Sequence, residues 1–259
     1  MRPKFAPLLA LLLFVIGCGG GRKNSSTSGV LSGNWQMSLQ SSNANLKPYQ
    51  QSGFLVQNGD TVTGNVLIAD NPCSGVGTVN GTVSGSSVSL AITPAAIEVD
   101  LTGSLSSTPG YMSGTFTILS SGCTASGTAP ESGTWAASLV SPLNGNIQGT
   151  FTSKNLTTPI TVTGQISQGA NTGIINAALS GNITFSNYCV ASTDITGVVS
   201  GTSVVLSLVN SDGTQVGQVT GTTSLDGTAF TGTYNILSQG SGAAIPCRGG
   251  DSGTVTFTL

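Results

Sequence analysis

Residues 112–119 read Met112-Ser113-Gly114-Thr115-Phe116-Thr117-Ile118-Leu119. Apolar or small residues take every second position, and hydroxyl side chains take the positions between them as far as Thr117. Successive side chains of a β-strand point to opposite faces, so this period of two predicts a strand with one dry and one wet face. The same pattern returns in residues 230–237, which read Phe230-Thr231-Gly232-Thr233-Tyr234-Asn235-Ile236-Leu237. The sequence of this predicted strand therefore occurs twice in the chain, in similar form.

The rest of the sequence repeats with it, at a period of about a hundred residues or slightly more, the size of one small domain. Four landmarks recur in one order: residues 32–35 with 132–135, residues 63–66 with 180–183, residues 80–88 with 196–204, and residues 112–119 with 230–237. The first of these matches contains both tryptophans of the chain, Trp35 two residues after Gly33 and Trp135 two residues after Gly133. We expect two β domains, residues 31–130 and 131–259.

Each half contains about eight short segments with strand periodicity, separated by turn residues. In the first half they lie near residues 34–40, 53–57, 61–69, 77–85, 87–92, 97–106, 111–119 and 123–129. Turn signals include Asn58-Gly59, Gly85, Asp212-Gly213 and Asp226-Gly227, which provide residues that tolerate positive φ. We predict an all-β protein made of two tandem antiparallel up-and-down meanders, each closed as a small barrel. A β-sandwich with the same strands is the alternative.

The first strand of each predicted half begins with a glycine and a tryptophan two residues later. Gly33-Asn34-Trp35 and Gly133-Thr134-Trp135 resemble the Gly-x-Trp signature of the calycin folds, the lipocalins and avidins. The resemblance implies up-and-down barrels of eight strands. The arginine that lipocalins place near the last strand has a counterpart only in Arg248, so the ligand residues of these families are not carried over.

The N-terminus has the pattern of an export signal. Arg2 and Lys4 precede an apolar run over residues 5–16, which is too short to cross a bilayer as a helix. The run ends in Val15-Ile16-Gly17-Cys18, which resembles the lipobox of bacterial lipoproteins. The resemblance implies a signal peptide over residues 1–17 and a Cys18 that carries the lipid anchor. An ordinary secretory signal is the alternative.

This anchor would make the membrane a partner and would place the protein in the cell envelope. Residues 18–30, rich in glycine and serine, are expected to form a flexible tether behind the lipidated cysteine. Gly19, rather than aspartate, follows Cys18, which resembles lipoproteins of the outer membrane of Gram-negative bacteria. The domains would then face the periplasm or the cell surface.

Four further cysteines lie in the two halves. They are Cys73, Cys123, Cys189 and Cys247. An even number of cysteines in an exported chain indicates disulfides, and their equivalent places in the repeat favour Cys73 with Cys123 and Cys189 with Cys247. A pairing across the halves would instead interlock the two repeats as one domain.

The charge of the chain argues against a nucleic-acid partner. Without residues 1–17 the chain keeps five of its seven basic residues and all nine acidic ones, a net charge of −4. The remaining basic residues, Arg22, Lys23, Lys47, Lys154 and Arg248, form no patch or stripe. Charged residues make up only 6% of the chain, so the surface consists mainly of hydroxyl, amide and glycine groups.

Catalytic groups are scarce in this sequence. The chain contains no histidine, which excludes Ser-His-Asp and Cys-His arrangements and imidazole metal ligands. Glu98 and Asp100 share one face of a predicted strand, as expected of a solvated edge. We therefore expect no catalytic residues, metal or cofactor, and a protein that is not an enzyme.

Three functions remain open. The first is a binding module for a small hydrophobic ligand or a glycan, with Trp35, Phe116, Trp135 and Tyr234 as ligand-facing or core aromatics. The second is a structural or adhesive surface lipoprotein with a solid core and protein or polymer partners. The third, a single membrane-spanning barrel of all strands, is disfavoured by the small number of aromatic residues.

Overall fold

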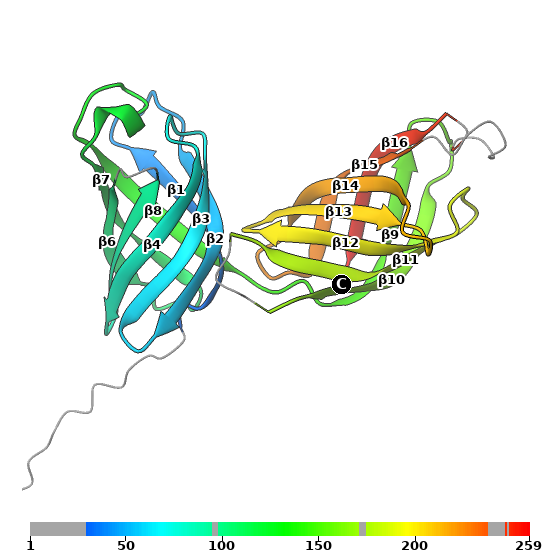
Figure 1. Cartoon of the computed structure of the whole chain (residues 1–259), viewed down its shortest axis with the longest axis horizontal. Helices are drawn as coiled ribbons and strands as arrows, with labels where there is room; N and C mark the ends of the chain where they lie inside the picture. Colours follow the sequence, from blue (N-terminus) through cyan, green and yellow to red (C-terminus); the bar gives the residue numbers. More distant parts are fainter. Residues whose placement is uncertain (1–29, 95–97, 171–174, 238–246, 248) are drawn as a thin grey trace, which may run out of the picture.

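The computed structural model describes residues 30–94, 98–170, 175–237, 247 and 249–259. Over these residues the chain forms two closed β-barrels, as the sequence predicts (Figure 1). Barrel 1 consists of β1 (Gly33–Ser41), β2 (Tyr49–Asn58), β3 (Thr61–Ala69), β4 (Gly75–Ser84), β5 (Ser87–Pro94), β6 (Val99–Leu105), β7 (Tyr111–Ile118) and β8 (Glu131–Val140). Barrel 2 consists of β9 (Gly145–Ser153), β10 (Ile160–Gln168), β11 (Ala177–Phe185), β12 (Ser192–Ser200), β13 (Ser203–Val209), β14 (Gln215–Thr223), β15 (Ala229–Ile236) and β16 (Asp251–Thr258).

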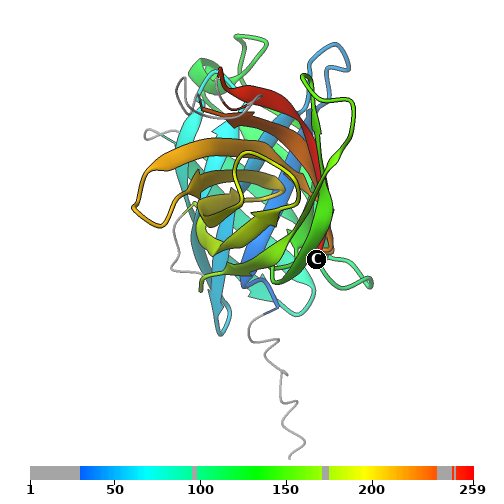
Figure 2. The ribbon, with the colours of Figure 1, turned by 90° about the vertical axis from the view of Figure 1, so that its right-hand side faces the viewer.

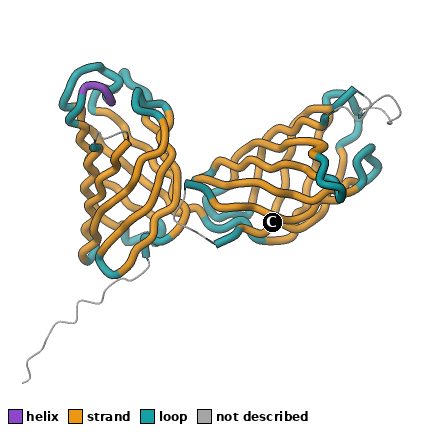
Figure 3. Tube along the Cα trace, in the orientation of Figure 1, coloured by secondary structure: helices purple, strands orange, loops and turns teal. Residues whose placement is uncertain are grey.

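Each barrel is an antiparallel meander in which neighbours in the chain are neighbours in the sheet. The first and last strands, β1 with β8 and β9 with β16, pair to close each barrel. Closure removes the exposed edges of an open sheet and rules out the β-sandwich alternative and a single sixteen-stranded barrel. The tube in Figure 3 shows strands throughout both units, with the short helix η1 (Ser121–Cys123) at one end of barrel 1. Among the described residues, no helix is long and apolar enough to span a membrane.

Close strand approach at glycines lets the sheets curl into such small barrels. Gly103 of β6 lies directly opposite Gly114 of β7, and a Cβ added to Gly114 would lie 1.9 Å from the carbonyl oxygen of Thr102. Barrel 2 repeats this arrangement with Gly221 opposite Gly232. Side chains at these positions would collide with the neighbouring backbone, so the inward glycines permit strong coiling.

The boundary between the domains lies later than the sequence pattern indicates. β8 pairs with β1 and β7, so residues 131–140 complete barrel 1, and barrel 2 begins at Gly145. The expected eighth strand at residues 123–129 is wrong, because this segment contains the end of η1 and a turn at Gly127, and β8 begins only after Pro130. A period of two identifies a strand but does not say which sheet it joins.

The two tryptophans are consequently not equivalent. Trp35 lies in the first strand of barrel 1 and Trp135 lies in the last strand, which pairs directly with the first. The structural counterpart of residues 33–36 is Gly145-Asn146-Ile147-Gln148, which opens β9. The counterpart of Glu131-Ser132-Gly133-Thr134, which opens β8, is Asp251-Ser252-Gly253-Thr254, which opens β16. The duplication holds, but its unit runs from β1 to β8.

Both disulfides form within a barrel, in the pairing that the repeat favours. Cys73 is bonded to Cys123, and Cys189 is bonded to Cys247. In each barrel the bridge lies at the end opposite to the connector that joins β8 to β9, so we name the two ends of a barrel the disulfide end and the connector end. Strand directions place the β4–β5 and β12–β13 hairpins at the connector ends.

The barrels differ in orientation. In Figure 1 the strands of barrel 1 run from top to bottom and those of barrel 2 from left to right, with the tip of the β12–β13 hairpin against β2 of barrel 1. Figure 2, turned by 90°, looks along barrel 2 and shows its strands encircling the interior. The connector end of barrel 2 therefore meets the side of barrel 1.

Candidate functional site

The aromatic residues expected to face a ligand or the core lie inside the barrels. Trp35, Phe116, Trp135 and Tyr234 are each at most 3% exposed. The indole nitrogen of Trp35 donates to the carbonyl oxygen of Leu31 at 2.9 Å, and that of Trp135 donates to the carbonyl oxygen of Thr102 at 3.1 Å. Satisfied indole groups in a packed interior indicate core residues.

The connector end of each barrel is closed by a leucine two residues before the first strand. Leu31 in barrel 1 and Leu143 in barrel 2 are almost completely buried. The backbone nitrogen of Leu31 donates to Gln57 Oε1 at 3.0 Å, and that of Leu143 donates to Gln168 Oε1 at 3.0 Å. In both repeats, therefore, a buried leucine covers the connector end, and a glutamine near the end of the second strand accepts a hydrogen bond from its backbone nitrogen.

The disulfide end of barrel 2 is closed by a buried polar cluster around Asp251. Its Oδ2 accepts hydrogen bonds from the hydroxyls of Tyr188 and Tyr234, both at 2.8 Å. Its Oδ1 accepts from Ser153 Oγ at 2.7 Å and Asn155 Nδ2 at 2.9 Å. Four donors satisfy the carboxylate, which is how a buried charge is retained without a counter-ion.

These contacts shift the ionisation of the cluster. Burial raises the pKa of Asp251, but the hydrogen bonds from Ser153, Tyr188, Tyr234 and Asn155 outweigh it and hold the pKa below its ordinary value. Burial, followed by the bond to Asp251, raises the pKa of both Tyr188 and Tyr234 above the ordinary value. The cluster therefore holds an ionised aspartate and neutral tyrosines at neutral pH.

The equivalent carboxylate of barrel 1, Glu131, has fewer donors. Its Oε1 accepts from the hydroxyl of Tyr49 at 2.6 Å, and Tyr49 in turn accepts from the backbone nitrogen of Ala125 at 2.9 Å. Burial and the bond to Glu131 raise the pKa of Tyr49 to about 12. Glu131 Oε2 is buried and has no hydrogen-bond partner within the described chain.

Among the described residues, buried side chains thus occupy the interiors of both barrels. We therefore turn to their outer surfaces. The barrels meet through Asn34 of β1, whose Nδ2 donates to the carbonyl oxygen of Gly201 at 2.8 Å and whose Oδ1 accepts from the nitrogen of Gly201 at 2.7 Å. Ser52 Oγ lies 3.0 Å from Ser200 Oγ, and Phe54 of β2 packs in the hydrophobic cluster of barrel 2. An apolar anchor and several polar contacts therefore hold the barrels together.

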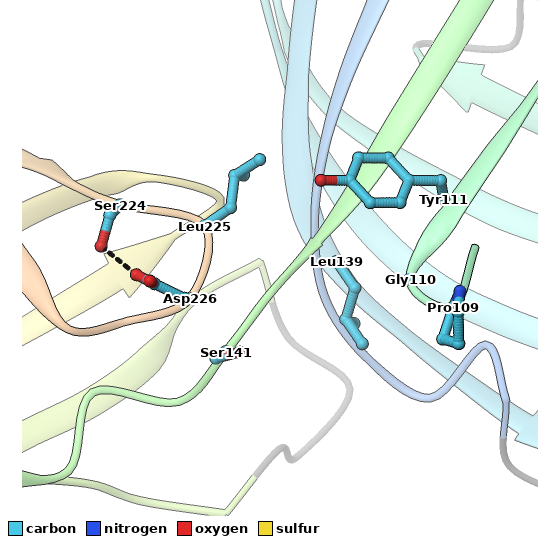
Figure 4. A pocket seen from close by; sticks show the side chains of 8 residues that line it. All are labelled: Pro109, Gly110, Tyr111, Leu139, Ser141, Ser224, Leu225 and Asp226. Carbon is cyan, nitrogen blue, oxygen red and sulfur yellow. Dashed lines mark hydrogen bonds between the residues drawn. The ribbon is translucent and has the colours of Figure 1, made fainter.

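A groove of about 550 Å³ lies beside this contact, at the connector ends of both barrels (Figure 4). Barrel 1 contributes Pro109, Gly110, Tyr111 and Leu139; Ser141 follows β8; and barrel 2 contributes Ser224, Leu225 and Asp226. Residue Tyr111 is 44% exposed and residue Leu225 is 37% exposed. In Figure 4 the hydroxyl end of Tyr111 points toward the side of the groove that carries Leu225. A groove of this volume suits a small ligand.

The walls of the groove are fixed to each other by the backbone. The nitrogen of Ser141 donates to the carbonyl oxygen of Leu225 at 2.8 Å. Gly227 has a φ of 72°, and a Cβ there would lie 2.9 Å from the carbonyl oxygen of Ser141. The β14–β15 turn is therefore packed against the connector, so the groove exists before any ligand binds.

Asp226 is the charged residue of the groove, and its orientation is set by its own turn. Its Oδ1 accepts from Ser224 Oγ, from the nitrogen of Thr228 at 3.2 Å and from Thr228 Oγ1 at 2.9 Å. These bonds lower the pKa of Asp226, with the contact from Ser224 the largest contribution. Its Oδ2 accepts no hydrogen bond from the described part of the chain, so it is available to a donor in the groove.

The sequence identified few of these residues. Asp226 was expected only as a turn residue, and Tyr111, Leu139 and Leu225 carry no motif. The residues that barrel 2 contributes to the groove lie more than eighty positions after those of barrel 1 and the connector, so that no local pattern brings them together. The carboxylates Glu131 and Asp251 share the signal of an acidic residue before Ser-Gly-Thr. Cys18 lies outside the described residues.

No cluster of three or more potential metal ligands of the histidine, cysteine, aspartate or glutamate type occurs among the described residues. The carboxylates of Asp251 and Asp226 instead accept hydrogen bonds from hydroxyl and amide donors.

Comparisons with known proteins yield only distant structural likeness. No protein-family model matches the chain, and no curated protein matches it. Kievitone hydratase from Nectria haematococca is 10% identical over 92% of both chains, with a TM-score of 0.24. Intact Ap-TbpB, with its N and C lobes, is 13% identical over 86% of this chain and 45% of its own, with a TM-score of 0.23.

One expectation from the sequence is corrected by these matches. The chain was expected not to be an enzyme, yet one of the similar structures is a hydratase, so this exclusion does not stand. At such TM-scores neither likeness assigns an activity or a partner to this chain. The barrel fold itself is compatible with binding.

Proposed function

We propose that this chain is a binding protein of the bacterial cell envelope, anchored by lipid on Cys18, which holds a glycan in the groove between its barrels. The observation that carries the proposal is that side chains fill and close both barrels, whereas the groove between them exposes Tyr111 and Leu225. The signal-peptide and lipobox resemblance of residues 1–18 supports the location.

A glycan fits the chemistry of the groove. Sugars combine an apolar face of C–H groups with hydroxyl donors. The ring of Tyr111, with Pro109 and Leu139, offers an apolar surface, and Asp226 Oδ2 offers a charged acceptor. Hydrogen bonds to a charged acceptor are stronger than neutral ones, so Asp226 would orient the sugar while the apolar groups supply contact area.

The ligand can be tested by native mass spectrometry on mature protein carrying Cys18→Ser, incubated with oligosaccharides released from the cell envelope. We expect an adduct on the parent protein and its loss in the double variant Tyr111→Ser/Leu225→Ser. A matched control is Leu67→Ser/Val76→Ser, an exposed apolar pair directly opposed on β3 and β4, which should retain the adduct. An adduct that survives the groove variant, or a bare chain mass for the parent, would contradict the proposal.

The anchor is tested separately in cells. We expect the wild-type protein to partition into the detergent phase of a Triton X-114 extract and to incorporate labelled palmitate, and the Cys18→Ser protein to do neither. Detergent partition of the Cys18→Ser protein would show that the lipid is not on this cysteine.

An adhesive or structural role is favoured by one further observation. Threonine hydroxyls face each other in pairs on the outer walls, with Thr102 and Thr115 at 3.2 Å and Thr220 and Thr233 at 3.3 Å. Such ladders present regular hydroxyl rows to a polymer. In that case binding to an insoluble envelope polymer would persist in the groove variant and would respond to substitutions in the threonine pairs.

A further inference from the structure

The contact between the barrels uses one outer face and one hairpin. The docking face consists of Asn34 and Gln36 on β1 and Ser52 on β2, all in barrel 1. The docking hairpin consists of residues 200–202, the β12–β13 turn of barrel 2. Because the chain is duplicated, each barrel has both parts. The contact inside the chain therefore leaves one face and one hairpin unused.

The unused face lies on barrel 2. Strand register makes Asn146, Gln148 and Thr163 the counterparts of the three docking-face residues, since Trp35 pairs with Gly53 as Ile147 pairs with Gly164. Two of the three residues are identical in type, and the third exchanges one hydroxyl side chain for another. All three are exposed, and they border a hollow of about 510 Å³ on the outer wall of β9 to β11.

The unused hairpin lies on barrel 1. Residues 84–86, Ser-Gly-Ser, form the β4–β5 turn and correspond to the Ser-Gly-Thr of the docking hairpin. Gly85 has a φ of 59° and Gly201 has a φ of 54°, so both turns present the same backbone groups. Gly201 is buried against barrel 1, whereas Gly85 is exposed and a Cβ there would have nothing within 4 Å.

We propose that a second copy of this chain docks its β4–β5 hairpin on the free face of barrel 2 and so repeats the contact that joins the barrels within one chain. Asn146 would bond both backbone groups of Gly85, Gln148 would accept from Ser86, and Thr163 would meet Ser84. The two surfaces differ, so the association is head-to-tail and builds an open chain of barrels or a closed ring. The proposal does not depend on a ligand in the groove.

One difference sets the strength of the contact. Phe54, the apolar anchor inside the chain, corresponds to Gln165, whose Nε2 donates to Asn146 Oδ1 at 3.3 Å. This contact would have to open or share its acceptor when a hairpin docks. The contact between copies therefore lacks the buried ring, and we expect it to be weaker and reversible. Such a contact suits molecules concentrated on a surface.

Cysteine trapping tests the proposal in the full mature chain. Ser52 and Ser200 have their Oγ atoms 3.0 Å apart, and their counterparts across two copies are Thr163 and Ser84. We expect the double variant Ser84→Cys/Thr163→Cys to give a ladder of dimers, trimers and longer species on a non-reducing gel after mild oxidation. The double variant Ser52→Cys/Ser200→Cys should form its bond within one chain and remain monomeric.

A further substitution distinguishes docking from random collision. Adding Asn146→Ala to the Ser84→Cys/Thr163→Cys variant should slow ladder formation about tenfold, because two hydrogen bonds to Gly85 are lost. Asn80→Ala, at an exposed asparagine on β4, should leave the rate unchanged. Monomers alone, or a ladder whose rate is the same with and without Asn146→Ala, would overturn the proposal.

Discussion

The two buried carboxylates show how the duplicated halves have diverged at single residues. Glu131 and Asp251 begin the last strands of their barrels, at equivalent positions. Asp251 receives four hydrogen bonds, whereas Glu131 receives one, from Tyr49. One substitution that contributes to this difference is Phe116 in barrel 1 where barrel 2 has Tyr234, the donor of one of the four bonds.

This comparison predicts opposite effects for two substitutions. Phe116 is opposite Gly133 just as Tyr234 is opposite Gly253, so the rings share a position. Tyr234→Phe should lower the free energy of unfolding by about 2 kcal/mol, because a bond to a buried charged acceptor is lost. Phe116→Tyr should raise it by about 1 kcal/mol, because Glu131 Oε2 gains a donor. Urea unfolding measures both; a loss of stability in Phe116→Tyr would contradict the equivalence.

The Asp251 cluster also predicts an acid dependence of stability. The pKa of Asp251 in the folded state is lowered from 3.8. Its ionised carboxylate therefore adds to the free energy of unfolding above pH 3.8, and this contribution is lost as the pH falls through the pKa of the folded state. Asp251→Asn should therefore flatten the decline of the melting temperature at acid pH. Asp212→Asn, at an exposed turn, is the matched control and should leave most of the decline in place. Equal slopes for Asp251→Asn and wild type would exclude this role.

At the residue scale, the sequence predicts the disulfides better than the polar clusters. The positions of Cys73, Cys123, Cys189 and Cys247 in the repeat are sufficient to predict their pairing, and the structure has it. Burial of Asp251 depends on donors from three other segments, among them Ser153 and Tyr188. Those partners become neighbours only when the barrel closes, so that no local pattern reveals them.

At the scale of elements, periodicity predicts most strands but not the membership of β8. Seven segments of the first half become β1 to β7 with small shifts at their ends. Trp35 and Trp135 are the only tryptophans, and matching them makes both strands the first of a half. This match therefore assigns β8 to the second half. The less conspicuous matches of Gly33 with Gly145 and Glu131 with Asp251 give the repeat that the sheet registers support.

The opposed glycines of neighbouring strands predict a sharp cost for a single methyl group. Gly114→Ala places a Cβ 1.9 Å from the carbonyl oxygen of Thr102, and the strands must separate to accept it. We expect a loss of about 3 kcal/mol in the free energy of unfolding. Gly249→Ala, where a Cβ would meet nothing within 4 Å, is the control and should be nearly neutral. Thermal unfolding of both variants checks this; equal melting temperatures would contradict the close packing.

At the scale of the whole molecule, the barrels are joined by a contact that one residue can break. A Cβ on Gly201 would lie 2.6 Å from the Cβ of Ser52, which cannot turn away as the end of the Gln36 side chain can, so Gly201→Ala should release the docking hairpin from barrel 1. Gly85→Ala imposes the same positive φ on alanine at a free hairpin and is the matched control. Small-angle X-ray scattering should show a larger radius of gyration for Gly201→Ala only. An unchanged radius of gyration would contradict this prediction and would show that Phe54 and the connector hold the barrels together without the docking hairpin.

The groove belongs to this scale as well, which explains why the sequence does not predict it. Its walls come from residues 109–111 and 224–226, one wall from each barrel, and they face each other because the docking hairpin and the bond from Ser141 to Leu225 fix the barrels. A sequence read one half at a time places a ligand inside a barrel. Because buried side chains occupy both barrel interiors, we place the ligand in the groove between the barrels instead.

The most direct measurement is hydrogen–deuterium exchange of the mature Cys18→Ser protein with and without the envelope oligosaccharide fraction. If the ligand binds between the barrels, peptides covering residues 106–112 and 223–228 will exchange more slowly in its presence, and peptides from the disulfide ends, such as 121–126 and 185–190, will be unchanged. Protection confined to the disulfide ends would instead mean that a barrel opens to take the ligand, and would contradict a site between two closed barrels.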